Sequence, residues 1–537
     1  MDKNGNSPSL KILITDDVSA EGLTLLEQAA DIDFDLVKGL TPETLAQRIP
    51  GYDGLIVRSS VKVTKEVLEA ADSLKVIGRA GVGVDNIDID TASLRGIVVM
   101  NTPGANTIAT AEHTVALLLA VCRLAPQAYM SMKQGRWDRK SFTGVQLYRK
   151  KMGIIGMGRI GMRVAARCQA FGMDVLTYDP YLSDEAAQEL KVKCVPLSDL
   201  LAEADFIALH AALTPNTERI INADAIAQMK NGVRIVNTAR GALIDTEALI
   251  DGLQSGKIAG VALDVFVEEP LPTDSPLLEM DNVIVTPHLA ASTVEAQADV
   301  GTQVVAQLID ALHGVDFRNA LNMPFSDAAL LRSMQPYLGL AENLGSIQAQ
   351  LAEDTIERIE VEIKGEDISD HIKPITVAIL KGLLEPHMEK AVNYINAPYL
   401  VERRGIKVSQ TKGLPTPDYP NLISCRIEWK GGGSRTISAT LFNHDEPRLV
   451  QFDGYRLDVR PEGTILVFHS YDRPGFIGRV GTVLGELGIN IATWRTGRTA
   501  PGGMAVSFVS VDKDVPDYVL NLLQEFELIN RIQKVKL

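Results

Sequence analysis

Between Lys151 and Val285 the chain alternates six short, β-rich runs with helix-like segments. The runs are Met152–Ile155, Asp174–Tyr178, Phe206–His210, Arg234–Asn237, Gly260–Leu263 and Val283–Val285. This alternation is typical of βαβ units, and consecutive βαβ units form a parallel sheet that is covered by helices on both faces. Six such strands in about 135 residues are what a complete doubly wound nucleotide-binding domain requires.

The first run is followed directly by the segment 156–161, which reads Gly-Met-Gly-Arg-Ile-Gly. Such a triplet of glycines also occurs in ordinary tight turns, but here it joins a strand to an amphipathic helix, as a dinucleotide-binding loop does. Gly156 would allow the tight turn, Gly158 would let the backbone approach a pyrophosphate, and Gly161 would let helix and strand pack closely. The N–H groups at the start of the helix would attract the phosphates.

The second run ends at Asp179, where an acidic group accepts hydrogen bonds from the hydroxyls of the adenine ribose. A carboxylate at this position repels a 2′-phosphate, and no arginine follows it in the next residues. The sequence therefore predicts NAD rather than NADP as the cofactor. The alternative role of Asp179 is to cap the turn before Pro180.

Polar motifs follow three further strands of the predicted sheet. They are Asn237–Asp245 (NTARGALID), Leu263–Pro270 (LDVFVEEP) and Thr286–Thr293 (TPHLAAST). Because ligands of open parallel sheets bind outside the carboxyl ends of the strands, these motifs should meet at one cleft.

The three motifs contain the groups that oxidation of a secondary alcohol requires. His288 suits the role of base because the pKa of histidine lies close to working pH. A carboxylate such as Glu269, bonded to the other ring nitrogen, would orient the imidazole and stabilise its protonated form. The planar fork of Arg240 would hold the carboxylate of a substrate. Of the other histidines, His210 is a candidate to line the cleft, and His113 is interpreted as structural.

The glycine loop and the three motifs resemble the signatures of the D-isomer specific 2-hydroxyacid dehydrogenase family. The resemblance implies that Arg240, Glu269 and His288 form the catalytic triad. Glu269 is preferred to its neighbour because it lies five residues after Asp264. It also implies that Asp264 and the backbone around Thr238 and Ala239 hold the nicotinamide end of NAD. The implied NAD-binding residues are Val82, Gly156, Gly158, Arg159, Ile160, Gly161, Asp179, Ala211, Thr238, Ala239, Arg240, Asp264, His288, Ala290 and Ala291. No metal site is predicted.

Within this family the whole chain is similar to the long-form members that act on D-3-phosphoglycerate. Residues 57–60 (VRSS) and 78–88 (GRAGVGVDNID) match first-lobe motifs of these members, and 135–144 (GRWDRKSFTG) matches a segment that brings cations to the substrate, in related enzymes from a neighbouring subunit. The implied substrate-binding residues are Arg58, Ser59, Arg79, Gly81, Arg139, Lys140 and Arg240. The alternative for Arg139 and Lys140 is a solvated surface pair.

Charge supports this expectation. The chain has 53 basic and 68 acidic residues and a net charge of −15, so it must gather cations locally to hold a ligand with about three negative charges. The same acidic balance argues against binding of nucleic acids or anionic membranes.

The predicted architecture is α/β, with two Rossmann-like doubly wound lobes followed by an α+β intervening domain and a ferredoxin-like ACT domain. The strands Leu10–Thr15, Gly54–Val57 and Val76–Ile77 belong to the first lobe, the helix Asn106–Arg123 connects the lobes, and the helix Thr293–His313 returns to the first. The predicted domains are residues 1–105 with 292–325 (substrate-binding lobe), 106–291 (NAD-binding domain), 326–462 (intervening domain) and 463–537 (ACT domain).

The tail is predicted to be a β-α-β-β-α-β unit. Its elements are Thr464–His469, Phe476–Leu487, Asn490–Gly497, Met504–Val511, Asp517–Phe526 and Ile529–Val535. The unit resembles an ACT domain, and in serine-regulated relatives the positions that match Asp472 and Asn490 bind L-serine at a domain interface. Ser470 departs from the His or Tyr of those relatives, so an assembly module without a ligand stays the alternative.

The four cysteines, Cys122, Cys168, Cys194 and Cys425, are scattered and are expected to be buried free thiols. No apolar leader or spanning segment is visible, so a cytoplasmic protein is expected, and family analogy suggests a homotetramer. Two other functions remain open: a glyoxylate or hydroxypyruvate reductase, and an NAD-sensing binding protein without catalysis.

Overall fold

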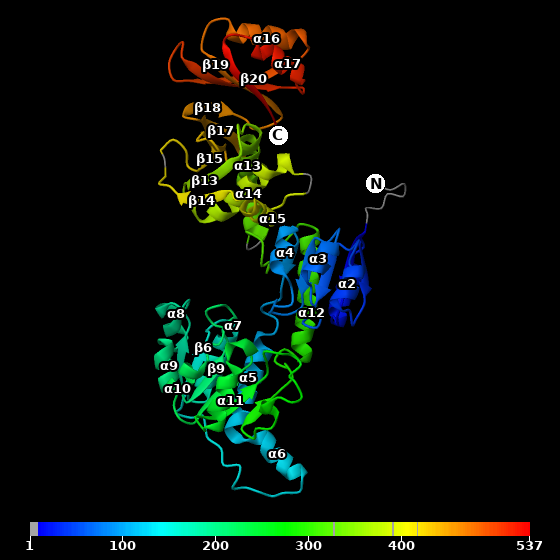
Figure 1. Ribbon diagram of the computed structural model, residues 1–537, viewed down its shortest axis with the longest axis vertical. Helices are drawn as coiled ribbons and strands as arrows, with labels where there is room; N and C mark the ends of the chain where they lie inside the picture. Colours follow the sequence, from blue (N-terminus) through cyan, green and yellow to red (C-terminus); the bar gives the residue numbers. More distant parts are fainter. Residues whose placement is uncertain (1–8, 326–327, 389–390, 416) are drawn as a thin grey trace.

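The computed structural model describes residues 9–325, 328–388, 391–415 and 417–537, and its strands form four separate sheets. Figure 1 shows these sheets along an elongated molecule, with the nucleotide-binding segment at one end and the C-terminal sheet at the other. Residues 1–8 and the predicted domain boundary at residue 326 lie outside the described residues. The predicted α/β class is confirmed, because the first two sheets are parallel and alternate with helices.

The first sheet is parallel and has the strand order β2-β1-β3-β4-β5. Its strands are β1 (Leu10–Ile14), β2 (Ile32–Leu36), β3 (Gly54–Val57), β4 (Val76–Arg79) and β5 (Val98–Met100), and its helices are α1 (Ala20–Gln28), α2 (Pro42–Arg48), α3 (Lys65–Ala70), α4 (Ile89–Leu94) and the returning α12 (Val294–Leu312). The strands β2 and β5 were not predicted. Helix α12 packs closely on the sheet, because a Cβ on Gly78 would approach Val304 to 2.8 Å and one on Gly54 would approach Leu308 to 3.1 Å.

The second sheet is also parallel, with the order β12-β11-β10-β9-β6-β7-β8. The strands are β6 (Lys151–Ile155), β7 (Asp174–Tyr178), β8 (Lys193–Cys194), β9 (Phe206–Leu209), β10 (Val233–Asn237), β11 (Ile258–Leu263) and β12 (Val283–Val285). The six predicted strands are present, and the two-residue edge strand β8 adds a seventh. Strand order reverses beside β6, and the crevice at such a reversal is where ligands of doubly wound sheets bind.

Helices cover this sheet on both faces. They are α5 (Thr107–Arg123), α7 (Arg159–Ala170), α8 (Asp184–Glu189), α9 (Leu197–Glu203), α10 (Ala223–Gln228) and α11 (Thr246–Gln254). Helix α6 (Ala125–Lys133) contacts α5 and extends away from the sheet (Figure 1). Helix α5 contacts α7 and strands β10, β11 and β12, so it lies across the sheet beneath the motifs that leave those strands.

The third sheet is mixed and has the order β14-β13-β15-β16-β17-β18. Its strands are β13 (Ile356–Lys364), β14 (Lys407–Lys412), β15 (Leu422–Trp429), β16 (Ser434–Phe442), β17 (Glu446–Phe452) and β18 (Tyr455–Val459), with helices α13 (Ala328–Gln350), α14 (Ile372–Leu384) and α15 (Asn396–Arg403). Helices α13 and α14 cross very closely, because a Cβ on Gly382 would lie 2.0 Å from the carbonyl oxygen of Glu342.

The C-terminal sheet has the ferredoxin-like order β20-β21-β19-β22, which confirms the predicted unit. Its elements are β19 (Thr464–Tyr471), α16 (Phe476–Glu486), β20 (Ile491–Arg498), β21 (Met504–Val511), α17 (Asp517–Gln524) and β22 (Ile529–Lys536). One face packs on α16 and α17, whereas Val467 and Phe508 on the other face share a core cluster with Phe452 of the third sheet. The last two sheets are therefore joined by apolar packing.

Two expectations about single features can be compared with this fold. Cys122, Cys168 and Cys425 are buried free thiols, but Cys194 is exposed, so the prediction was wrong there because β8 is a short edge strand at the surface. Among the described residues, no single helix is long and apolar enough to cross a membrane. In the described part of the chain, one helix pair, α5 with α6, has the length and composition together, and the two helices are bent by 65°.

Candidate active site

The glycine loop leaves β6 at the point where the strand order reverses. Gly156 has φ +95°, and a Cβ there would lie 2.6 Å from the backbone nitrogen of Ala211. A Cβ on Gly161 would lie 2.2 Å from the carbonyl oxygen of Gly156, whereas Gly158 has no atom within 4 Å of its Cβ position. The loop thus combines a turn that requires glycine at 156, a close contact between helix and strand at Gly161, and open space in which a ligand can approach the backbone of Gly158. Helix α7 starts at Arg159 without a side-chain cap, so this region fits the pyrophosphate of a dinucleotide.

Asp179 at the end of β7 serves the same loop. Its Oδ2 accepts a hydrogen bond from the N–H of Met157 at 2.7 Å, and its Oδ1 accepts one from the N–H of Tyr181 at 2.9 Å. The carboxylate therefore braces the glycine loop and also caps the turn at Pro180. Bracing by a carboxylate leaves negative charge beside the loop, which fits a ribose hydroxyl better than a 2′-phosphate.

His288 and Glu269 are brought together across the carboxyl ends of β12 and β11. The Nδ1 of His288 lies 2.8 Å from Oε2 of Glu269, and Oε1 of Glu269 accepts a hydrogen bond from the N–H of Phe266 at 3.0 Å. The side chain of His288 is 46% exposed and that of Glu269 is 37% exposed. Since Nδ1 is engaged by the carboxylate, Nε2 is the ring nitrogen left for proton exchange with a ligand.

Arg240 leaves β10 beside this pair and reaches toward the first lobe. A Cβ on the next residue, Gly241, would lie 2.0 Å from the carbonyl carbon of Phe266, so the arginine and glutamate motifs are packed against each other. The Nε of Arg240 donates to Oδ2 of Asp85 at 3.0 Å, and its Nη1 donates to the carbonyl oxygen of Ala239 at 2.7 Å. The guanidinium is thus held between the two lobes.

A cluster of guanidinium groups, Arg58, Arg79 and Arg240, forms at this junction. Burial, and then the positive charges of Arg240 and Arg58, lower the pKa of Arg79 to about 10, while Asp85 opposes the shift. The Nε of Arg79 is buried and has no hydrogen-bond partner in the described part of the chain. A cation that is crowded by like charges and incompletely bonded is suited to an anionic ligand.

The remaining predicted NAD-site residues lie around the same crevice but differ in exposure. Thr238 is buried, and its hydroxyl lies 2.7 Å from that of Thr114 on α5. Asp264 was expected to hold the nicotinamide end, but its side chain is fully buried and both oxygens accept hydrogen bonds from protein groups. Partly buried positions are Val82, Ile160, Ala211, Ala239 and Ala291, while Ala290 is buried and Arg159 is exposed.

Two groups of predicted residues do not join a site within one chain. Arg139 and Lys140 are exposed in the segment after α6, which extends away from the first lobe in Figure 1. Asp472 pairs with Arg498 at 2.6 Å, whereas Asn490 donates to Asp512 at 2.7 Å at the other end of the C-terminal sheet.

Three residues were assigned no role, or a different one, from the sequence. Asp85 pairs with Arg240, although the pattern around it gave no sign of this partner. His113 was interpreted as structural, but its Nε2 lies 3.2 Å from Oδ1 of Asp264, directly behind the histidine motif. That His210 lines the cleft stays a prediction; both of its ring nitrogens are buried without partners among the described residues, and burial lowers its pKa to about 4.

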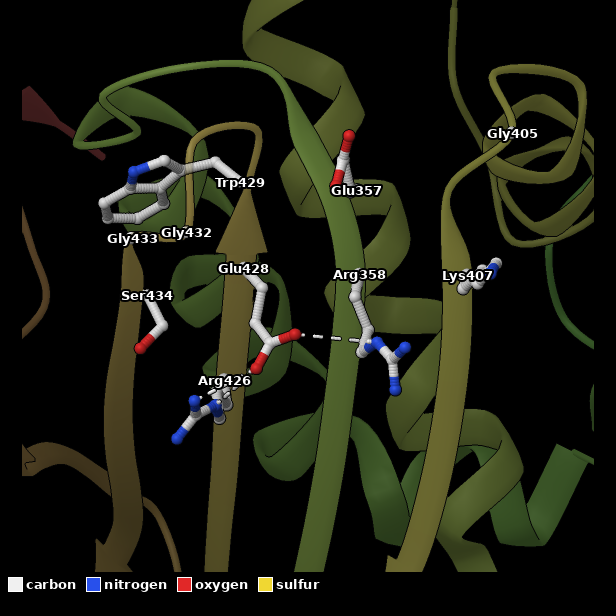
Figure 2. A pocket seen from close by; sticks show the side chains of 10 residues that line it. All are labelled: Glu357, Arg358, Gly405, Lys407, Arg426, Glu428, Trp429, Gly432, Gly433 and Ser434. Carbon is white, nitrogen blue, oxygen red and sulfur yellow. Dashed lines mark hydrogen bonds and ion pairs between the residues drawn. The ribbon is translucent and has the colours of Figure 1, made fainter.

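A separate pocket of about 470 Å³ lies on the third sheet, far from these groups. Figure 2 shows its cations facing carboxylates: Arg358 lies 3.6 Å from Glu428, and Arg426 lies 3.0 Å from the same side chain. The two arginines of this pocket are thus each paired with a carboxylate, whereas the buried Nε of Arg79 in the other cluster has no hydrogen-bond partner among the described residues.

The doubly wound sheet, the glycine loop, and a histidine–glutamate pair beside the cluster of arginines define an NAD-dependent oxidoreductase. Residues 115–290 match the family model for the NAD binding domain of the D-isomer specific 2-hydroxyacid dehydrogenases. Residues 333–453 match the D-3-phosphoglycerate dehydrogenase intervening domain, and residues 464–527 match the ACT domain.

Relatives match nearly the whole chain. It is 43% identical to D-3-phosphoglycerate dehydrogenase of Methanocaldococcus jannaschii, over 98% of this chain and 100% of that protein. It is 38% identical to D-3-phosphoglycerate dehydrogenase of Bacillus subtilis, over 98% of this chain and 99% of that protein. The chain belongs to the D-3-phosphoglycerate dehydrogenases of the D-isomer specific 2-hydroxyacid dehydrogenase family.

Solved structures resemble part of the chain. D-Lactate dehydrogenase from Aquifex aeolicus, complexed with NAD and lactic acid, matches with a TM-score of 0.52 and 32% identity, over 56% of this chain and 96% of that chain. A glyoxylate reductase from Paecilomyes thermophila matches with a TM-score of 0.55 and 31% identity, over 59% of this chain and 99% of that chain.

The glycine loop yields a test of cofactor binding. We expect Gly156→Ala to weaken the binding of NAD by about tenfold or more, because a Cβ that displaces the backbone of Ala211 costs roughly 1–3 kcal/mol and moves the loop. The dissociation constant is measured by calorimetry. Gly232→Ala is the matched control, since Gly232 also has positive φ but has open space at its Cβ position. Equal NAD affinity in both variants would contradict the placement of the loop.

Proposed function

We propose that this chain oxidises D-3-phosphoglycerate at C2 with NAD, giving 3-phosphohydroxypyruvate, the first step of phosphorylated L-serine synthesis. The observation that carries the proposal is the cluster of Arg58, Arg79 and Arg240 next to the His288–Glu269 pair. A ligand with a carboxylate and a phosphate needs several cations around its reacting carbon. The whole-chain similarity to D-3-phosphoglycerate dehydrogenases supports the same substrate.

The residues divide the reaction between them. NAD, when bound, supplies the carbon that accepts the hydride from C2. His288 takes the proton of the C2 hydroxyl at Nε2, because its Nδ1 is bonded to Glu269. Glu269 stabilises the imidazolium that results, and Arg240 holds the carboxylate and the carbonyl oxygen that develops beside it.

The proposal assigns the other residues by their place around the crevice. The pyrophosphate of NAD would be held by Gly156, Gly158, Arg159, Ile160 and Gly161, and the adenine ribose by Asp179 and Ala211. The nicotinamide end would be held by Val82, Thr238, Ala239, Ala290 and Ala291. Asp264 would contribute through the backbone that it bonds, since its side chain is fully buried. Arg58, Ser59, Arg79 and Gly81 complete the substrate site.

A panel of substrates tests the function. We expect the full-length protein to give its highest kcat/KM with 3-phosphoglycerate and NAD, because only this substrate engages the whole cation cluster. Initial rates are compared with those for hydroxypyruvate, glyoxylate and 2-oxoglutarate in the presence of NADH. Preference for glyoxylate or hydroxypyruvate would identify a reductase, and NAD binding without any turnover would identify a sensing protein.

Loss of Arg58 should affect the KM for the substrate but not the KM for the cofactor. We expect Arg58→Ala to raise KM for 3-phosphoglycerate by about tenfold or more, since a charge-assisted hydrogen bond is worth roughly 1.5–3 kcal/mol. KM for NAD should stay within about twofold, because the glycine loop leaves a different strand. Arg48→Ala is the control, as Arg48 pairs with Asp35 on the surface of the same lobe. An unchanged KM for 3-phosphoglycerate would remove Arg58 from the site.

We propose that the protein forms a homotetramer, in which dimers form through the nucleotide-binding lobes. Helix α6 and the segment after it expose large apolar side chains, namely Tyr129, Met130, Met132 and Trp137. Exposed apolar groups gathered on one protruding segment favour a protein partner. A second copy bound there would also carry Arg139 and Lys140 toward a neighbouring substrate site.

Free thiols are typical of a reducing compartment, and we place the protein in the cytoplasm.

L-Serine is proposed as an effector bound between two ACT domains. Asp472 follows the end of β19 that pairs with Met504, whereas Asn490 precedes the end of β20 that pairs with Val511. These ends are separated by roughly 23 Å at about 3.3 Å per residue, so one serine molecule could contact both positions only if each came from a different chain.

This arrangement predicts feedback inhibition. We expect millimolar L-serine to lower the initial rate of 3-phosphoglycerate oxidation. Serine bound between two ACT domains would favour one arrangement of the subunits, and that arrangement would be the less active one. The measurement is a titration of the tetramer with L-serine, with D-serine as the stereochemical control. An unchanged rate would favour the alternative, an ACT unit that only assembles the protein.

A further inference from the structure

A buried carboxylate lies beneath the turn that carries His288. The side chain of Asp264 has no exposed surface. Its Oδ1 accepts hydrogen bonds from the N–H of Leu289 at 2.7 Å and the hydroxyl of Thr286 at 2.5 Å, and its Oδ2 accepts one from the N–H of Ala290 at 2.9 Å. Three donors from the segment 286–290 therefore close on one carboxylate, which sets the shape of the turn.

The turn holds His288 in an unusual backbone conformation. Its φ is +54°, in the left-handed region, which costs a non-glycine residue roughly 1–2 kcal/mol. Such a conformation persists only where the surroundings impose it. Because the imidazole leaves the apex of this turn to meet Glu269, small changes in the turn would change the direction of Nε2.

One further side chain reaches the carboxylate from outside the turn. His113, on helix α5, places Nε2 3.2 Å from Oδ1 of Asp264 and 3.3 Å from the hydroxyl of Thr286. Burial would raise the pKa of Asp264, but hydrogen bonds from His113, Thr286 and the two backbone N–H groups outweigh it and lower the pKa. Asp264 is therefore a buried carboxylate that His113 reaches from a different element than the turn.

We infer that His113 is a positioning residue for the base His288, acting through Asp264 and the 286–290 turn. This inference rests on the proposed function. Without the Nε2–H of His113, the buried carboxylate of Asp264 would lose its donor from α5. An incompletely bonded buried charge is unfavourable, so neighbouring donors would move to bond it. The neighbours that can shift are the hydroxyl of Thr286 and the N–H groups that shape the turn. His113 would thus affect the alignment of His288, which it does not touch.

The test separates alignment from binding and from stability. His113→Leu is expected to lower kcat by about tenfold or more, because misplacement of a catalytic group by about 1 Å can cost up to a hundredfold. KM for 3-phosphoglycerate should stay within about twofold, since the arginine cluster lies on other elements than His113. The dissociation constant of NAD should change less than kcat, since the glycine loop is distant in sequence from the turn, although Ala290 of the turn lies at the proposed nicotinamide end. The primary isotope effect with C2-deuterated substrate should rise as the chemical step becomes slower.

Conservative variants distinguish this role from simple packing. The amide nitrogen of Gln reaches about as far as Nε2, whereas that of Asn is shorter, so His113→Gln should recover most of kcat and His113→Asn should not. Thr286→Val removes the other side-chain donor to Asp264, and its effect on kcat should be non-additive with that of His113→Leu. His313→Leu is the control, since His313 also pairs with an aspartate, Asp31 at 2.8 Å, but on the first lobe.

The outcomes are decisive in each direction. A lower melting temperature with kcat unchanged in His113→Leu would overturn the inference, and so would equal kcat in the Gln and Asn variants. If His113→Leu does not fold, the comparison of Gln with Asn decides. Failure of the wild-type protein to oxidise 3-phosphoglycerate would contradict the proposed function instead, and that result is obtained before any variant is made.

Discussion

Adjacency of three parallel strands is the constraint on which the candidate site depends. Strands β10, β11 and β12 lie side by side with Asn237 paired to Leu263 and Leu263 to Val285, so the loops that leave their carboxyl ends must share one edge of the sheet. That edge receives an arginine, a glutamate and a histidine from three separate parts of the chain. The packing of Gly241 against Phe266, and the bond between His288 and Glu269, then fix the loops against each other. The strand order therefore brings these three side chains together without the help of a ligand.

The local charge at this edge is opposite in sign to the net charge of the chain. The protein has a net charge of −15, yet Arg58, Arg79 and Arg240 lie close enough for their charges to lower the pKa of Arg79. Like charges gathered in a partly buried junction are unfavourable alone and become favourable when an anion binds. Asp85 offsets part of the repulsion through its bond to Arg240, and a polyanionic substrate would offset the rest. Substrate binding would therefore relieve charge repulsion at the contact between the two lobes.

The sequence predicted the parts of the fold that have strong local patterns. The six strands of the nucleotide-binding sheet and the C-terminal β-α-β-β-α-β unit were found, because each strand there is a buried apolar run or joins clear turns. The edge strand β2 was missed because its pattern IDFDL leaves most side chains partly or fully exposed, and β8 was missed because it has only two residues. In the third sheet, β17 mixes polar and apolar residues on both faces, so its periodicity is weak. Strands β16 and β18 alternate polar with apolar residues, a local signal from which both could have been predicted.

Prediction of the site was limited by contacts that only the tertiary structure creates. The motifs indicated His288 and Glu269, and these side chains do meet. The pairing of Asp85 with Arg240 joins different lobes, and that of His113 with Asp264 joins a helix to a strand end, so spacing along the chain carries no signal of either. Arg139 and Lys140 show another limit, since a role in a neighbouring subunit has no counterpart inside one chain.

The arrangement of the last two sheets constrains how the tail can influence this site. Val467 and Phe508 of the C-terminal sheet are buried in one core with Phe452 of the third sheet, so separating them would expose apolar surface to water. At its other end, the intervening segment contacts the first lobe, where Asn393 donates to the carbonyl oxygen of Gly96 at 2.8 Å, just after α4. The tail and the third sheet should therefore move as one body against α4. Because the loop before α4 carries Asp85, the partner of Arg240, such a motion would act on the cation cluster rather than on the glycine loop.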